Sequence, residues 1–148
     1  MPIIIYFLLP VLFIASWTDF RERRIPNSLL FPSFLLALVL NIVISGSSGL
    51  LHSLAGAFMG FVLLIIPYAL GGIGAGDVKL LIVIGSFGGI YFVLYSFLAG
   101  ALIGGVLSFT ILIFNKVSRK RNSSIPYGIP LSLGVLVYVI SLHWGFLR

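Results

Sequence analysis

The chain consists of six apolar runs that are separated by short polar or glycine-rich interruptions. The runs cover residues 2–18, 28–45, 50–71, 78–88, 90–115 and 126–146. A bilayer core of about 30 Å needs about 20 apolar residues in each helix that crosses it. The pattern therefore predicts an all-α, polytopic membrane protein, with six transmembrane helices in a single domain over residues 1–148. The short interruptions leave no room for a soluble domain.

The fourth and fifth runs are interpreted as two helices rather than one. As one helix, residues 78–115 would be about 57 Å long, which is too long for a single crossing. We expect the break at Gly85 to Gly89, with a later break near Tyr95 to Ala99 as the alternative. The earlier break makes the fourth helix too short to reach the far interface, unless its outer turn is sunk among other helices.

Two pairs of glycines have the four-residue spacing that lets helix backbones approach each other closely. They are Gly56 with Gly60 and Gly100 with Gly104. Because glycine and alanine are common throughout this sequence, we expect both pairs to pack helices within the chain rather than to form a dimer interface.

The composition agrees with a membrane protein and excludes several kinds of chemistry. Only 8% of the residues are charged, against about a quarter in soluble domains, and the mean hydropathy is +1.23. Without cysteine there is no disulfide, no thiolate zinc site and no cysteine nucleophile. His52 and His143 are too few and too scattered for a metal cluster, so we expect neither a metal nor a cofactor.

The first run lacks the basic start and cleavage site of a signal peptide, so we expect it to be retained.

The basic residues predict the orientation of the chain. Lys and Arg number nine, and all except Arg148 lie in or next to the interruptions at 19–27, 72–77 and 116–125. Cytoplasmic loops of membrane proteins carry this excess of positive charge. With six crossings these interruptions share one side, so we expect both termini on the non-cytoplasmic side. The expected location is the cytoplasmic (inner) membrane.

Two of the three acidic residues, Asp19 and Asp77, lie where an apolar run meets a polar interruption. A charge near hydrocarbon is costly, so such residues are candidates for function. Each has a plainer explanation, because Arg21 or Arg23 could neutralise Asp19, and Asp77 could cap the helix that follows it. The predicted topology, however, brings both aspartates independently to the cytoplasmic side.

Two carboxyl groups that converge at a water-accessible interface can share one proton, because repulsion and partial desolvation separate their pKa values. The ionised group can then activate water while the protonated group gives its proton to a scissile carbonyl oxygen. This chemistry is that of an aspartic protease, which needs no metal, thiol or hydroxyl nucleophile.

Residues beside the aspartates have simpler expected roles. Asn27 is expected to cap the second helix, which follows Pro26. Gly74 and Gly76 let the backbone before Asp77 pass close to another segment. Lys79 could tune the carboxyl pair, bind substrate or anchor its helix at the lipid headgroups, and anchoring is the plainest of these.

Three runs follow one another in a familiar order: DFRERRIPN at 19–27, GAGDVKLL at 74–81, and the turn formed by Pro126, Tyr127 and Gly128. Together they resemble the type IV prepilin peptidases, membrane aspartic proteases of the GxGD type. The resemblance implies that Asp19 and Asp77 are the catalytic pair, which removes the basic leader of prepilin-like substrates at the cytoplasmic face. Residues implied to bind substrate or support the site are Gly74, Gly76, Lys79, Asn27, Tyr127 and Gly128.

The sequence departs from the family pattern in two ways. Larger members have an additional N-terminal cytoplasmic region, often with paired cysteines, that is linked to methylation of the new N-terminus. This chain shows neither, so we expect a peptidase without methylation activity. After Gly128 the chain continues with Ile129 and Pro130, where the family commonly has a small residue, and this affects the expected fine specificity.

Two other functions are weighed against this interpretation. A presenilin-like intramembrane protease shares the Gly-x-Gly-Asp element, but Asp19 borders a charged loop, which favours a cut near the membrane surface. A small proton-coupled transporter would use one aspartate as a proton site, but the sequence shows neither mid-helix charges nor repeated halves.

The implied partners are prepilin or pseudopilin substrates and membrane lipids, and no nucleic acid. Such substrates have a basic leader followed by a hydrophobic helix. The inner loops and the leader are both basic, so charge attraction cannot explain recognition. We expect the substrate's hydrophobic helix to dock among the helices, on a surface that the sequence does not identify.

Overall fold

The structure, a computed structural model, describes residues 2–22, 24–118 and 128–143. They form four helices: α1 (Pro2–Glu22), α2 (Asn27–Ala69), α3 (Ala75–Ser118) and α4 (Gly128–His143). No strand occurs over the described residues, in agreement with the all-α prediction. Three stretches are long and apolar enough to cross a membrane, namely Ile4–Glu22, Asn27–Ala69 and Ala75–Val106. These features are those of a multi-pass membrane protein.

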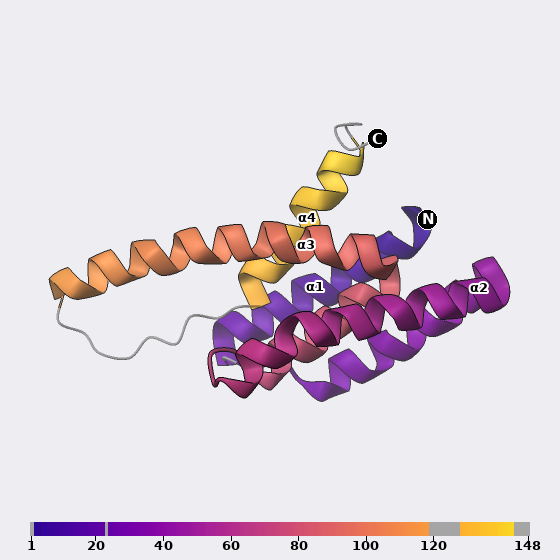
Figure 1. The fold of residues 1–148 in the computed structure, drawn as a ribbon, viewed down its shortest axis with the longest axis horizontal. Helices are drawn as coiled ribbons and strands as arrows, with labels where there is room; N and C mark the ends of the chain where they lie inside the picture. The colour runs from indigo at the N-terminus through magenta and orange to yellow at the C-terminus, as the bar shows by residue number, and fades with distance from the viewer. Residues whose placement is uncertain (1, 23, 119–127, 144–148) are drawn as a thin grey trace.

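The two long helices are each interrupted by one glycine with non-helical backbone angles. Gly46 has φ 60° and ψ −140°, and Gly89 has φ 81° and ψ −172°. Glycine suits both positions, because it adopts positive φ without steric cost. Near these residues α2 and α3 fold back on themselves (Figure 1). The six apolar runs thus correspond to six helical segments, whereas the number of membrane crossings stays a prediction.

The first half of α3 is the most enclosed part of the molecule. Its side chains Leu80, Leu81 and Ile84 have no exposed surface. The residues of this segment after Lys79 are almost all apolar, so the helix has no distinct polar face there. A helix that is apolar all round is expected to be surrounded by other elements. The most extensive contacts are those of α3 with α2 and with α4.

Glycines allow this close packing around α3. A Cβ atom at Gly56 of α2 would run into the carbonyl oxygen of Gly85, and one at Gly60 would contact the carbonyl of Leu81. The second half of α3 meets α4 in the same way, with Gly100 against Pro130 and Leu131. The prediction that both glycine pairs pack helices within the chain is therefore confirmed.

The turn at Gly89 is packed against α2. The carbonyl oxygen of Ser86 accepts hydrogen bonds from Asn41 Nδ2 (3.1 Å) and Ser53 Oγ (2.6 Å), and His52 Nε2 lies 3.2 Å from the carbonyl oxygen of Gly88. The last carbonyl groups of a helix need such partners when water is excluded. The break therefore lies in the earlier of the two predicted places, with its turn packed among other helices.

Two helix boundaries differ from the expected ones. Helix α1 continues to Glu22 rather than ending at residue 18, and α3 begins at Ala75 rather than at 78. Polar residues end an apolar run without ending a helix, and Arg21 in the last turn of α1 interacts favourably with the helix dipole. Asp19 therefore lies in the last turn of a helix and not in a loop.

Candidate active site

Asp19 is buried near the C-terminal end of α1, with 6% of its surface exposed. Its Oδ2 atom accepts a hydrogen bond of 2.9 Å from the backbone N–H of Gly128, the first residue of α4. The first N–H groups of a helix have no partner within the helix and attract negative charge. The first backbone N–H group of α4 is therefore a hydrogen-bond donor to the Asp19 carboxylate.

Gly128 lies so close to Asp19 that a larger residue would displace one of the two. A Cβ atom at this position would lie 2.7 Å from Asp19 Oδ2 and 3.2 Å from its Cγ atom. Either the carboxyl group or the start of α4 would have to move. The resemblance identified Gly128 as a residue of the site, and the structure places it in direct contact with Asp19. Tyr127, also expected near the site, lies outside the described residues.

Asp77 is the second buried carboxyl group, with 8% of its surface exposed. The sequence predicted it as the residue just before a helix, but α3 already begins at Ala75, so Asp77 lies in the first turn. Its Oδ2 atom accepts a hydrogen bond of 3.3 Å from the N–H of Gly74. This is the contact that an acidic residue at the third helical position makes in a capping box.

The two aspartates lie near each other although 57 residues separate them in the sequence. The charge of Asp19 acts on Asp77, and both side chains are almost entirely shielded from solvent. Two carboxyl groups in such an environment resist being ionised together. The arrangement supports the division into one acid and one carboxylate that the predicted chemistry requires.

The chain segments around the two aspartates are also joined directly. Lys79 Nζ donates a hydrogen bond of 2.9 Å to Asn27 Oδ1, and the backbone at Gly76 lies against Ile25, where a Cβ atom would be 3.4 Å from that of Ile25. The structure thus brings Asn27, Gly74, Gly76, Lys79 and Gly128 to the same end of the molecule as the aspartates.

The expected role of Asn27 as a helix cap is wrong. Helix α2 begins at Asn27 itself, its N-cap is Pro26, and no side chain caps it. The side-chain oxygen of Asn27 instead accepts the hydrogen bond from Lys79. Residues two apart on an α-helix differ in direction by about 200°, so Lys79 and Asp77 point to nearly opposite sides of α3. Lys79 faces α2, where Asn27 accepts its hydrogen bond.

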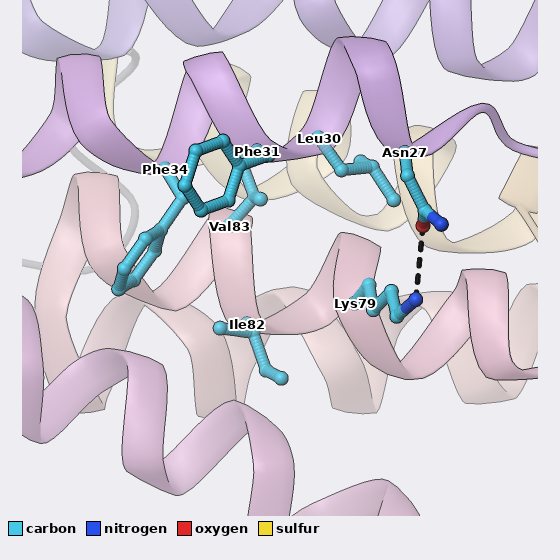
Figure 2. Close-up of a pocket in the computed structure, with 7 residues that line it drawn as sticks. All are labelled: Asn27, Leu30, Phe31, Phe34, Lys79, Ile82 and Val83. Atoms are coloured by element: carbon cyan, nitrogen blue, oxygen red, sulfur yellow. Dashed lines mark hydrogen bonds between the residues drawn. The ribbon is translucent and has the colours of Figure 1, made fainter.

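An open groove begins at the Lys79–Asn27 hydrogen bond, between the first half of α2 and the first half of α3. It has a volume of about 430 Å³. Its apolar walls are Leu30, Phe31, Phe34, Ile82 and Val83. Figure 2 shows Asn27 and Lys79 at one end and Phe34 at the other. Sequence reasoning did not identify this groove, although two phenylalanines about one helical turn apart, Phe31 and Phe34, were a signal for it.

The donor groups of the site do not form a metal centre. In the part of the chain that the structure describes, no three His, Cys, Asp or Glu side chains come together. His52 lies at the outer turn, where it contacts Gly88. Two carboxyl groups at the site are able to exchange protons with water.

A model described as the type IV leader peptidase family matches residues 6–109, which include both aspartates and both motif runs around them. The chain belongs to the type IV leader peptidase family. A curated protein to which this chain is similar is a prepilin leader peptidase/N-methyltransferase from Vibrio cholerae serotype O1. The two are 28% identical over 145 residues, which cover 94% of this chain and 54% of the relative. The chain thus spans about half the length of this relative. No solved structure matches the chain.

Proposed function

We propose that this protein is an aspartic endopeptidase of the membrane that removes the basic leader from type IV prepilin-like substrates, with Asp19 and Asp77 as its catalytic pair. The observation that carries the proposal is the pairing itself. Two buried carboxyl groups come from separate helices, and each accepts a hydrogen bond from a backbone N–H group at the start of a helix. The family assignment and the name of the Vibrio cholerae relative support the same activity.

The reaction follows from one ionised and one protonated carboxyl group. The ionised carboxylate takes a proton from water as the water oxygen bonds to the scissile carbonyl carbon, and the protonated carboxyl gives its proton to the carbonyl oxygen. When the tetrahedral intermediate collapses, the C–N bond breaks and the leaving amine takes the proton that came from water. The carbonyl re-forms and returns its proton to the other carboxylate, so the pair is restored.

We further propose that the six helical segments cross the membrane six times, with both termini on the non-cytoplasmic side and the aspartates at the cytoplasmic face of the inner membrane. The breaks at Gly46 and Gly89 support six segments, and the distribution of Lys and Arg supports the orientation. Asp19 in the last turn of α1 and Asp77 in the first turn of α3 are both at helix ends. This favours a cut near the membrane surface over the mid-membrane cut of a presenilin-like protease.

The test is direct cleavage by the purified protein. In detergent, with a type IV prepilin, we expect loss of the leader through a single cut, which mass spectrometry of both products locates. A chelator should leave the rate unchanged, because no step uses a metal. Loss of activity that added Zn²⁺ or Mg²⁺ restores would contradict the proposed mechanism.

A further inference from the structure

The groove between α2 and α3 combines an apolar interior with a polar end next to the candidate active site (Figure 2). We infer that this groove binds the hydrophobic helix of the substrate, with the start of that helix at the Asn27–Lys79 end. The inference rests on the proposed function and adds to it the surface that recognises the substrate. It names one occupant, an apolar helix that follows a basic leader in the substrate chain.

The first reason is continuity between the groove and the aspartates. Lys79 belongs to the same helix start as Asp77, and Asn27 opens the helix that follows the segment after Asp19. The hydrogen bond between Asn27 and Lys79 closes the groove at this end. A substrate helix in the groove would therefore begin at the end of the molecule that carries both aspartates.

The second reason is the accessibility and the chemistry of the walls. Phe31 is 66% exposed, while Leu30 of the same helix and Val83 of α3 are buried and line the groove. Helices in a membrane associate by close packing rather than by escape from water. An open groove with a flat aromatic flank and an aliphatic floor offers such packing to a helix that enters from the lipid.

The third reason is charge. Lys79 is the cationic side chain at the groove, and it is exposed at the polar end. A positive charge there repels a basic leader and does not repel an uncharged helix. Lys79 therefore keeps the basic leader out of the groove, so that only the apolar helix of the substrate enters it.

The test uses two phenylalanines that are matched in type and exposure. Phe31 lines the groove, and Phe58, in the second half of α2, lies outside it and is 67% exposed. With a full prepilin in membranes or detergent micelles, Phe31→Ala should raise KM by about fivefold through lost packing, with kcat little changed. Phe58→Ala should leave both constants unchanged. A short soluble peptide that spans the cut but lacks the helix should be cleaved equally by wild type and Phe31→Ala.

Cross-linking tests the occupant directly, because the natural chain has no cysteine. Phe31→Cys and Phe58→Cys are made in an Asp77→Asn background, so that a bound prepilin is not cleaved. We expect Phe31→Cys to form a disulfide with a cysteine in the first turns of the prepilin helix, and not with one in the leader. Phe58→Cys should form neither.

Other outcomes overturn the inference. Equal effects of Phe31→Ala and Phe58→Ala, cross-linking of Phe31→Cys to the leader, or its cross-linking only to a second copy of this chain would each show that the groove does not bind the substrate helix. If the wild-type protein cleaves the prepilin in these experiments, the proposed function stands even when the groove fails. Absence of cleavage by the wild type would instead end the proposed function, and with it this inference.

Discussion

At the scale of single residues, the site depends on a backbone that approaches a carboxyl group more closely than any side chain would allow. Gly128 provides both the N–H group that binds Asp19 and the empty space in which the carboxyl group lies. Asp77 has a looser partner, at 3.3 Å from the N–H of Gly74. The position of Asp19 is therefore the more sensitive of the two to a small change in its neighbour.

The variant Gly128→Ala tests this dependence. Its methyl group would displace the Asp19 carboxyl group, and a displacement of about 1 Å in a catalytic group can cost about 100-fold in rate. We expect kcat for prepilin cleavage to fall by about that factor while the protein still folds. Gly105→Ala is the control, because a Cβ atom there meets nothing within 4 Å. Equal activity of the two variants would show that the Gly128 contact does not position Asp19.

At the scale of helices, the short segment 75–88 is the unusual element. Asp77 lies in its first turn, and its other end stops inside the protein, where Asn41, Ser53 and His52 of α2 contact its last carbonyl groups. The segment is therefore held at both ends, by the inner contact between Lys79 and Asn27 and by the outer contacts with α2. This fixation keeps Asp77 in place opposite Asp19.

Two serines of α2 allow us to measure how much the contacts between α2 and the turn at Gly89 contribute to the free energy of unfolding. Ser53 Oγ bonds across to Ser86 of α3, whereas Ser48 Oγ bonds only to Ser45 of its own helix. Ser53→Ala should lower the free energy of unfolding by about 1 kcal/mol, the usual net value of one hydrogen bond. Ser48→Ala should lower it by much less. Unfolding in mixed micelles measures both, and equal values would contradict the role given to the outer contacts.

The sequence predicts the helices well and their ends less well. Local composition and residue spacing were enough to predict three features. These are the six apolar helical segments, the break before Ile90 and the packing of Gly56 within the chain. The C-terminal end of α1 and the start of α3 were misplaced because Asp19 to Glu22 are mostly charged, and Ala75 to Asp77 are small or charged, and yet both stretches are helical. Apolar patterning marks where the hydrocarbon ends, whereas the helix ends where its last N–H and carbonyl groups find other partners.

At the scale of the whole molecule, the contacts that build the site join segments that are distant in the sequence. The bond between Gly128 and Asp19 spans 109 positions and that between Lys79 and Asn27 spans 52. No local pattern encodes such pairs. The resemblance to a family supplied the residues, but the capping role expected for Asn27 was wrong because its tertiary partner, Lys79, could not be inferred from its neighbours.

The proposed topology makes a prediction of its own, for which the cysteine-free chain is well suited. Single cysteines at Ser47, beside the break at Gly46, and at Glu22, at the end of α1, are exposed in the structure. With a membrane-impermeant maleimide on cells whose inner membrane is intact, Ser47→Cys should react at once, and Glu22→Cys only after permeabilisation. The opposite labelling pattern would invert the proposed orientation.

The central claim is that Asp19 and Asp77 act as one catalytic pair, and replacing each carboxyl group by an amide tests it most directly. Asn keeps the size of Asp but cannot exchange the proton that the reaction moves. Asp19→Asn and Asp77→Asn should each lower the rate of leader removal from a purified prepilin by at least about 1000-fold, within the range of general acid–base catalysis, with unfolding transitions close to the wild type. Processing of the prepilin at the wild-type rate by either folded variant would contradict the claim.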